Sequence, residues 1–171
     1  MLLNILKYGD PVLRKKAAPV TEFNTELKKT ADDMFYSMYA NNGIGLAANQ
    51  VGILKQLLVL DASKEEKPLV FVLVNPKIIE NSREKSNFEE GCLSFPGLNE
   101  TIRRPLTIKV KFQDLTGKET LLEASGLLAT VIQHELDHLN GILFIDRMTP
   151  VRRLLHSKEL KEIKKLSKKT K

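Results

Sequence analysis

The residues best suited to chemistry form the pattern His134-Glu135-Leu136-Asp137-His138. Positions four apart lie on one face of a helix, so both imidazoles can bind one metal ion. Glu135 stands beside one ligand and can serve as the proton-transfer group of a metal-dependent hydrolase. Two buried histidines that bond only to neighbouring groups would be the simpler explanation. However, two imidazoles and a carboxylate in so apolar a segment would be costly without a partner, which favours a metal site.

A catalytic metal usually has three protein ligands and an open position for water, so a third ligand is needed. The only later histidine is His156, which lies in a basic region and which we expect at the surface. The alternative is Cys92, within Glu90-Gly91-Cys92-Leu93-Ser94. The simplest role of a lone cysteine would be that of a small buried hydrophobe. Because a thiolate beside two imidazoles suits zinc or ferrous iron, we predict Cys92, His134 and His138 as ligands.

A third segment, Gly43-Ile44-Gly45-Leu46-Ala47-Ala48-Asn49-Gln50, combines small residues with a terminal amide. Glycine and alanine allow a backbone to lie close to another chain or to a ligand. Taken alone, the segment is better explained as a tight connection between a helix and a strand. The amide of Gln50 can nevertheless donate an N–H to a developing oxyanion, which makes the segment a candidate part of the site.

The elements that must position these residues follow from hydrophobic periodicity and turn-forming residues. We expect helices over 24–42, 127–140 and 150–165, strands over 56–61, 69–75, 107–112 and 119–124, and a turn over 114–118. The second helix is apolar around much of its circumference, which is typical of a core helix. We therefore predict an α+β fold, with mixed or antiparallel β-sheets around a central buried helix that carries the H-E-x-x-H motif, and with a C-terminal helix.

The composition is that of a globular protein with one core. The chain has 171 residues, of which 42% are hydrophobic and 28% charged. We expect a single catalytic domain over 1–171, with 151–171 as a basic C-terminal helix and tail. No apolar run approaches the roughly 20 residues that span a bilayer, and the N-terminus lacks the features of a signal peptide. We therefore expect no membrane contact and a cytoplasmic location.

Positive charge is concentrated at the C-terminal end. Residues 151–171 hold nine lysines and arginines against two glutamates, a net charge of +7, while the whole chain carries +6. A solvated helix face would explain this distribution. Electrostatic docking onto an anionic partner such as RNA would explain it equally well.

Together the three chemical segments resemble the signature motifs of the peptide deformylase family. They are Gly43-Ile44-Gly45-Leu46-Ala47-Ala48-Asn49-Gln50, Glu90-Gly91-Cys92-Leu93-Ser94 and Gln133-His134-Glu135-Leu136-Asp137-His138-Leu139-Asn140-Gly141. Their order and separation match, and Asp10-Pro11-Val12-Leu13-Arg14 with Pro19-Val20 resembles the family's opening segment. The resemblance covers essentially the whole chain. It implies that the formyl group is removed from the N-terminal formylmethionine of nascent polypeptides, with release of formate.

The resemblance also implies a cofactor and a set of catalytic roles. The native metal would be Fe2+, with Zn2+, Ni2+ or Co2+ able to occupy the same site. Glu135 would take the proton of the attacking water and deliver it to the departing amine. The amide of Gln50 and the backbone N–H of Leu93 would meet the oxyanion.

Substrate binding and partners follow from the same resemblance. The substrate-binding residues would be Gly43, Ile44, Gly45, Phe88, Glu90, Gly91, Leu127 and Val131. Of these, Ile44, Phe88, Leu127 and Val131 would surround the methionine side chain together with His134. The C-terminal helix is similar to that of a bacterial type in which it is implicated in ribosome docking.

The sequence departs from the family pattern at a few positions. Phe95 follows the second motif where Ile or Val is frequent, and Asn42 stands where an acidic residue often precedes the glycine segment. Arg103 and Arg104 are candidates for an arginine that steadies the site, but Asn42 leaves the acidic partner of that arginine open. Gln133 and Asp137 are candidates for groups that orient the metal ligands, and Asp137 can instead simply cap or solvate the helix.

Two other functional classes stay open at this stage. H-E-x-x-H alone does not separate a deformylase from a zinc endopeptidase, which would cleave internal bonds of unformylated substrates. The basic tail also allows an RNA- or ribosome-binding module that keeps its metal only for structure. Such a site would be closed by a fourth protein ligand, and the sequence offers no clear candidate.

Overall fold

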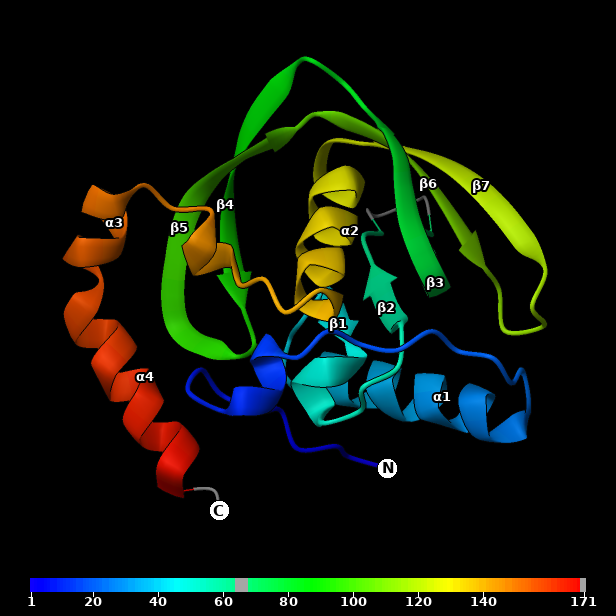
Figure 1. Cartoon of the computed structure of the whole chain (residues 1–171), viewed down its shortest axis with the longest axis horizontal. Coiled ribbons are helices and arrows are strands. Elements are labelled where there is room, and N and C mark those ends of the chain that lie inside the picture. The colour runs from blue at the N-terminus through cyan, green and yellow to red at the C-terminus, as the bar shows by residue number, and fades with distance from the viewer. Residues whose placement is uncertain (64–67, 170–171) are drawn as a thin grey trace.

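Helix α2 (Gly126–Leu139), which carries the H-E-x-x-H pattern, runs between two antiparallel β-sheets (Figure 1). The computed structural model describes residues 1–63 and 68–169, so 170–171, at the end of the predicted basic tail, lie outside the described residues. Helix α2 contacts strands of both sheets, and most of its residues are buried. The predicted α+β class is therefore confirmed, with the motif helix at its centre.

The larger sheet has the strand order β1-β2-β3-β6-β7, and the smaller sheet is the hairpin β4–β5. The strands are β1 (Gly45–Ala47), β2 (Leu57–Asp61), β3 (Val70–Asn81), β4 (Lys85–Cys92), β5 (Phe95–Pro105), β6 (Thr107–Gln113) and β7 (Glu119–Ser125). The four predicted strands correspond to β2, β3, β6 and β7, although β3 extends beyond the predicted end. The predicted turn over 114–118 joins β6 to β7, and the backbone N–H of Asp114 donates to Lys118 O (3.0 Å).

Strands β1, β4 and β5 are absent from the sequence prediction. Strand β5 does alternate between buried and exposed residues, but two of its buried positions are Glu100 and Arg104. Charged side chains at inward positions obscure the period of two on which a strand prediction depends. Strand β1 has three residues, which is too short for a periodic signal.

Strand β2 joins two parts of the core. Leu58 and Leu60 pack in the cluster that contains α2, whereas Leu57 and Val59 pack against helix α1 (Thr25–Ala40). This division follows from strand geometry, because successive side chains point to opposite faces of a sheet. Strand β2 is therefore apolar from Leu57 to Leu60, and α1 and α2 cover its opposite faces.

The ends of α1 and α2 agree closely with the predicted boundaries. Asn24 caps α1 by accepting from the backbone N–H of Leu27 (3.0 Å). Gly141, just beyond α2, has φ +74°, and a Cβ there would lie 2.5 Å from Arg14 O, so this stop requires glycine. Short 3-10 helices span Pro11–Arg14, Ala48–Val51 and Phe144–Asp146. No helix in the described part of the chain is both long and apolar enough to cross a membrane.

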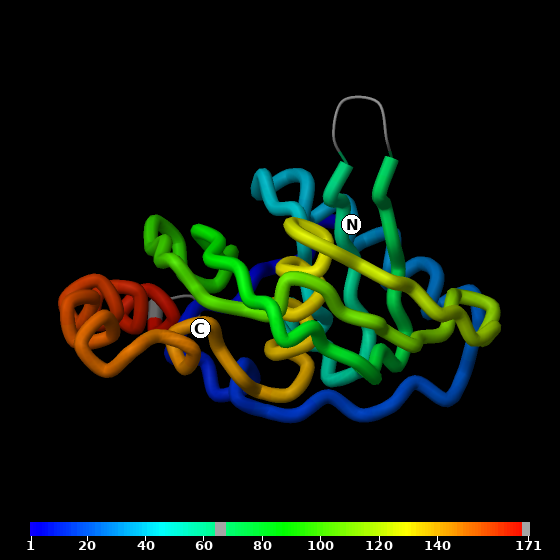
Figure 2. The backbone as a smooth tube through the Cα atoms, turned by 90° about the horizontal axis from the view of Figure 1, so that it is seen from above, coloured from blue at the N-terminus to red at the C-terminus, as the bar shows by residue number. Residues whose placement is uncertain are grey.

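The single C-terminal helix predicted over 150–165 is wrong, because two helices occupy this region. They are α3 (Pro150–Leu155) and α4 (Ser157–Lys169), and the chain changes direction at His156 (Figures 1 and 2). His156, which we expected at the surface, is only partly exposed: its side chain is 23% exposed and its Nε2 lies 3.1 Å from Glu100 Oε2. The buried Glu100 carboxylate needs a polar partner, and His156 provides one at the bend between the helices.

Helix α4 shares a hydrophobic cluster with the smaller sheet. Leu160 and Ile163 are buried in the cluster that includes Phe95 and Ile102 of β5. In Figure 2 the C-terminal helices lie at one end of the molecule, opposite the β6–β7 turn. The basic helix is therefore packed against the strand pair that carries Cys92.

Replacing Ile163 with alanine should lower the free energy of unfolding by about 3 kcal/mol, because a buried aliphatic side chain is removed and a cavity remains. Denaturation in urea measures the change. Leu154→Ala is the matched control: this side chain is 72% exposed, so a change within about 0.5 kcal/mol is expected. Equal stability of the two variants would contradict the packing of α4 on β5.

Candidate metal centre

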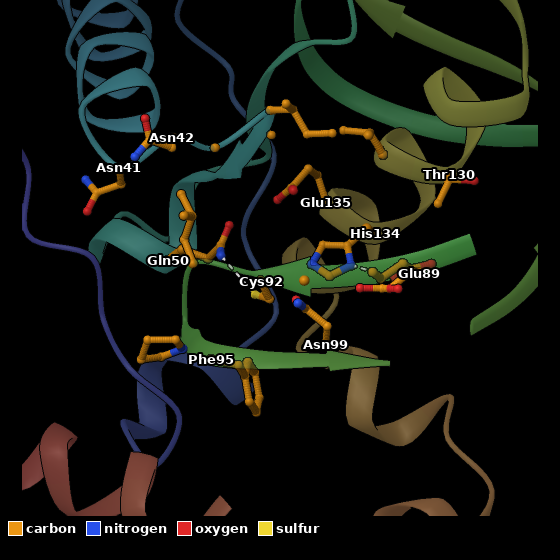
Figure 3. Close-up of a pocket in the computed structure, with 18 of the residues that line it drawn as sticks. Asn41, Asn42, Gln50, Glu89, Cys92, Phe95, Asn99, Thr130, His134 and Glu135 are labelled. Carbon is orange, nitrogen blue, oxygen red and sulfur yellow. Dashed lines mark hydrogen bonds and ion pairs between the residues drawn. The ribbon is translucent and has the colours of Figure 1, made fainter. Parts of the chain in front are cut away.

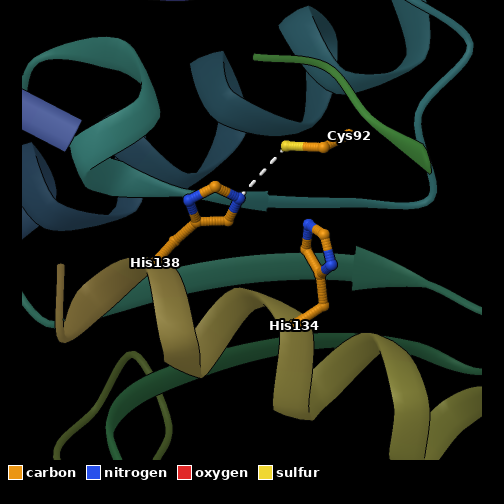
Figure 4. A group of neighbouring side chains, drawn as sticks. All are labelled: Cys92, His134 and His138. Carbon is orange, nitrogen blue, oxygen red and sulfur yellow. Dashed lines mark hydrogen bonds between the residues drawn. The ribbon is translucent and has the colours of Figure 1, made fainter. Parts of the chain in front are cut away.

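The three predicted metal ligands lie together (Figure 4). Helix α2 presents His134 and His138 one turn apart, and Cys92, the last residue of β4, faces them. One ligand atom from each residue lies within 4.8 Å of the other two, and His138 Nε2 is 3.2 Å from Cys92 Sγ. One thiolate and two imidazoles form a donor set that suits a transition metal such as zinc or iron.

The surroundings of the two histidines also fit a cation. His134 Nδ1 bonds to Glu90 Oε2 (2.8 Å), which leaves its Nε2 for a metal. Burial by itself lowers the pKa of His134, but hydrogen bonds with Cys92 and Glu90 raise this pKa well above its usual value. The groups around His134 therefore stabilise a positive charge at this position. Burial holds the pKa of His138 well below its usual value, so this imidazole is neutral, as a ligand must be.

A buried ion-pair network holds His134 in place. Arg104 donates from Nε to Glu90 Oε1 (2.6 Å), from Nη2 to Glu90 Oε2 (3.0 Å) and from Nη1 to Asp137 Oδ2 (2.8 Å). Burial alone would raise the pKa of Glu90, but hydrogen bonds from His134 and Arg104 keep it below its usual value. Glu90 is therefore a carboxylate that orients the His134 ring.

The network shows which arginine lies beside the predicted metal ligands and which acidic residues pair with it. Arg104 is buried and Arg103 is exposed, so Arg104 is the arginine that steadies the site. Its acidic partners are Glu90 and Asp137, which makes an acidic residue at position 42 unnecessary. Asp137 thus supports His134 through Arg104 and Glu90. Gln133 instead donates to two backbone carbonyl groups, those of Pro105 (3.1 Å) and Ala129 (2.9 Å).

Glu135 lines the cavity together with Cys92 and His134 (Figure 3). Burial raises the pKa of its carboxyl group to about 7. Among the described residues, its Oε2 atom is buried and has no hydrogen-bond partner. A Cβ atom at Gly45 would lie 2.5 Å from Glu135 Oε1, so the absence of a side chain at Gly45 makes room for this carboxylate. A proton acceptor with such a pKa is suited to general acid–base chemistry near neutral pH.

Gln50 and Leu93 reach the same site from two different segments. Gln50 Oε1 accepts from the backbone N–H of Ala47 (2.8 Å), which fixes the orientation of the amide. Its Nε2 then lies 3.5 Å from Cys92 Sγ and 3.2 Å from Ser94 Oγ (Figure 3). Leu93 directly follows Cys92 in the two-residue turn between β4 and β5.

These residues open onto a cavity of about 570 Å³. All predicted substrate-binding residues line it, namely Gly43, Ile44, Gly45, Phe88, Glu90, Gly91, Leu127 and Val131. Several other residues that line the cavity were not predicted as site residues from the sequence. They are Lys7, Asn41, Asn42, Glu89, Phe95, Pro96, Gly97, Asn99 and Thr130. Predicting the β4–β5 hairpin would have identified one of them, because Asn99 pairs with Gly91 across it.

Residues 2–154 match the family model described as polypeptide deformylase. The chain belongs to this family. It is 50% identical over 147 residues to a peptide deformylase of Rhizobium meliloti strain 1021, a match that covers 84% of this chain and 83% of the relative. It is 48% identical over 161 residues to a peptide deformylase of Thermodesulfovibrio yellowstonii, with 94% and 97% covered.

Solved structures of deformylases show the same fold. A crystal structure of peptide deformylase from Plasmodium falciparum superposes with a TM-score of 0.92 at 40% identity, and 98% of each chain is covered. A crystal structure of Arabidopsis thaliana peptide deformylase 1B gives a TM-score of 0.92 at 42% identity, with 98% of this chain and 94% of that chain covered.

Family membership decides between the enzyme classes left open by the sequence. The chain is a metal-dependent hydrolase that removes the formyl group from the N-terminal formylmethionine of nascent polypeptides and releases formate. Family membership and this cluster of three side chains indicate a divalent metal as the cofactor. The zinc endopeptidase alternative and the module with a purely structural metal are set aside.

Exchanging Glu90 for glutamine should weaken metal affinity by about 10- to 100-fold, since the residue that orients His134 loses its charge. Competition with a chelator measures the affinity. Glu89→Gln is the matched control, because it makes the same exchange at the adjacent, exposed position. If both variants bound metal as tightly as the unmodified protein, Glu90 would have no part in orienting the ligand.

Proposed function

We propose that Cys92, His134 and His138 hold the divalent metal and that Glu135 is the catalytic acid–base residue. The observation that carries this proposal is the convergence of three ligand atoms, two of them on buried histidines, at the cavity that Glu135 also lines. When bound, the metal supplies the Lewis acidity that activates water and polarises the formyl oxygen. The thiolate and imidazole donors support Fe2+ as the native metal, with Zn2+, Ni2+ or Co2+ able to replace it.

Glu135 moves the proton in both halves of the reaction. Its Oε2 accepts the proton of the water that attacks the formyl carbon and later delivers this proton to the departing amine. A pKa of about 7 suits both steps, since the carboxylate takes up a proton readily and releases it readily near neutral pH. Gly45 supports this role by leaving room for the carboxylate.

The developing oxyanion is stabilised by two N–H donors of the protein. The backbone N–H of Ala47 occupies Gln50 Oε1, so the amide presents its Nε2 toward Cys92 and the cavity. The backbone N–H of Leu93, in the turn after Cys92, is the second donor. Donors that are already oriented before the reaction stabilise the transition state without a reorganisation cost.

The cavity accounts for selectivity toward formylmethionine. Ile44, Phe88, Leu127 and Val131 provide apolar surface for the methionine side chain, beside His134. Gly43, Gly45 and Gly91 line the same cavity, and we expect the peptide backbone of the substrate to lie along them. The formyl group is small because its carbonyl carbon carries only hydrogen, so a narrow site can admit it and exclude bulkier acyl groups.

Glu135→Gln should retain metal but lower kcat on a formyl-Met peptide by at least about 100-fold, because the proton acceptor is removed. The assay is run without oxygen, and the metal content of the same sample is determined. Cys92→Ala provides the contrast, since this variant should lose metal and activity together. Substantial turnover by Glu135→Gln, or full metal content in Cys92→Ala, would contradict the assigned roles.

We further propose that residues 1–171 form one cytoplasmic catalytic domain that docks on the ribosome through its basic C-terminal helix. Leu160 and Ile163 pack into the core, so α4 presents its opposite face to solvent. The exposed lysines of that helix are Lys158, Lys161, Lys164, Lys165 and Lys168. A basic face of this kind favours an RNA-rich surface, where nascent chains emerge.

Replacing Lys158, Lys161, Lys165 and Lys168 with glutamine should weaken ribosome binding and flatten its salt dependence, by about one unit of slope for each phosphate that the helix no longer neutralises. Turnover of a short formyl peptide should stay unchanged, because Leu160 and Ile163 still hold the helix on the core. Replacing Lys15, Lys16, Lys28 and Lys29 with glutamine is the control, which removes the same charge at other exposed positions. Equal ribosome affinity in the two variants would refute docking through α4.

A further inference from the structure

The segment Leu6–Tyr8, here called the N-terminal strap, bonds to both segments that carry the proposed oxyanion donors. The backbone N–H of Leu6 donates to Gln50 O (2.8 Å), and that of Tyr8 donates to Ser94 O (2.9 Å). Between them, Lys7 Nζ donates to Leu93 O (2.8 Å). Three consecutive residues therefore contact Gln50, Leu93 and Ser94.

These hydrogen bonds fix how far apart the two donor segments lie. The N–H groups of Leu6 and Tyr8 are two residues apart, so the length of the chain limits their separation to about 7 Å. Gln50 and Ser94 are bonded to two such groups and also to each other, through Gln50 Nε2 and Ser94 Oγ (3.2 Å). The Tyr8 ring stacks on Phe95 (centroids 4.9 Å apart), which ties the strap to the start of β5.

Of the three hydrogen bonds from the strap, only that of Lys7 is donated by a side chain. The turn between β4 and β5 has two central residues, Leu93 and Ser94, and the strap bonds to the carbonyl groups of both. Tyr8 holds the Ser94 carbonyl by its backbone, whereas the Leu93 carbonyl depends on the Lys7 side chain. Among the described residues, Lys7 is the only lysine or arginine that lines the cavity. An ammonium group that is partly removed from water is costly to keep unless it is bonded.

We propose that Lys7 is a positioning residue of this deformylase, whose ammonium group holds the Leu93 carbonyl and thereby keeps the Leu93 N–H aligned with Gln50 Nε2. The proposal rests on the oxyanion role proposed above for Leu93 and Gln50. Lys7 acts through the turn and needs no contact with the substrate. A small displacement of an N–H group that stabilises the transition state slows the reaction, and a shift of about 1 Å can lower the rate by up to 100-fold.

The test compares Lys7→Met, which keeps the aliphatic stem, with Lys7→Arg, which keeps the charge and the donors. Lys7→Met should lower kcat on a formyl-Met peptide about tenfold, with KM within about twofold, while Lys7→Arg should recover most of the loss. Metal content and the thermal unfolding midpoint are measured on the same samples and should stay unchanged. Lys16→Met is the control at an exposed lysine and should behave like the unmodified protein.

Three results would overturn the proposal. They are an unchanged kcat in Lys7→Met, a fall in kcat matched by a fall in bound metal, and a rise in KM alone, which would mean direct substrate binding. If Lys7→Met does not fold, Lys7→Gln serves the same comparison. Gln50→Ala is assayed in parallel, because full activity there contradicts the oxyanion role itself, independently of Lys7.

Discussion

The paired charges of Glu90, Arg104 and Asp137, buried beside the motif helix, are the constraint on which the rest of the structure depends. Removing three charged groups from water is costly unless each one is bonded within the protein. Here Arg104 bonds to both carboxylates, and Glu90 also accepts from His134. The arrangement works only if β4, β5 and α2 meet at one place. It therefore links the position of a metal ligand to the packing of the two sheets around the helix.

Strand β5 also connects the buried charges to the C-terminal helices. Its residues Phe95 and Ile102 pack with α4, and its buried Glu100 is bonded to His156 at the bend before that helix. On the other side, the N-terminal strap connects the turn after Cys92 to Gln50. The hairpin that supplies the thiolate is thus held by both ends of the chain. Such support suits a site that must keep its reacting groups in fixed geometry during turnover.

Two buried carboxyl groups of this centre have pKa values that are shifted in opposite directions. Among the described residues, Glu135 has no ion pair and its Oε2 has no hydrogen-bond partner, and burial raises the pKa of its carboxyl group to about 7. Glu90 is also buried, but hydrogen bonds from Arg104 and His134 keep its pKa below the usual value. Two carboxylates on adjoining elements therefore differ in protonation because their partners differ. This difference suits Glu135 to the proton transfer proposed for it, and Glu90 to orienting the His134 ring.

The sequence by itself determined the chemistry and much of the framework. Helical spacing predicted His134 and His138 as a pair and the motif helix as buried, because these patterns are local along the chain. Cys92 followed from donor chemistry, since a third ligand was needed beside two imidazoles. The sequence prediction failed where the structure depends on contacts between distant segments. Inward-facing Glu100 and Arg104 hid strand β5, and the bend at His156 divided a helix that periodicity predicted as continuous. Only the tertiary structure decided that Arg104 pairs with Glu90 and Asp137, and that Lys7 reaches the turn after Cys92. Those pairings join segments far apart in sequence, and the partners are fixed by the packing of sheets and helices.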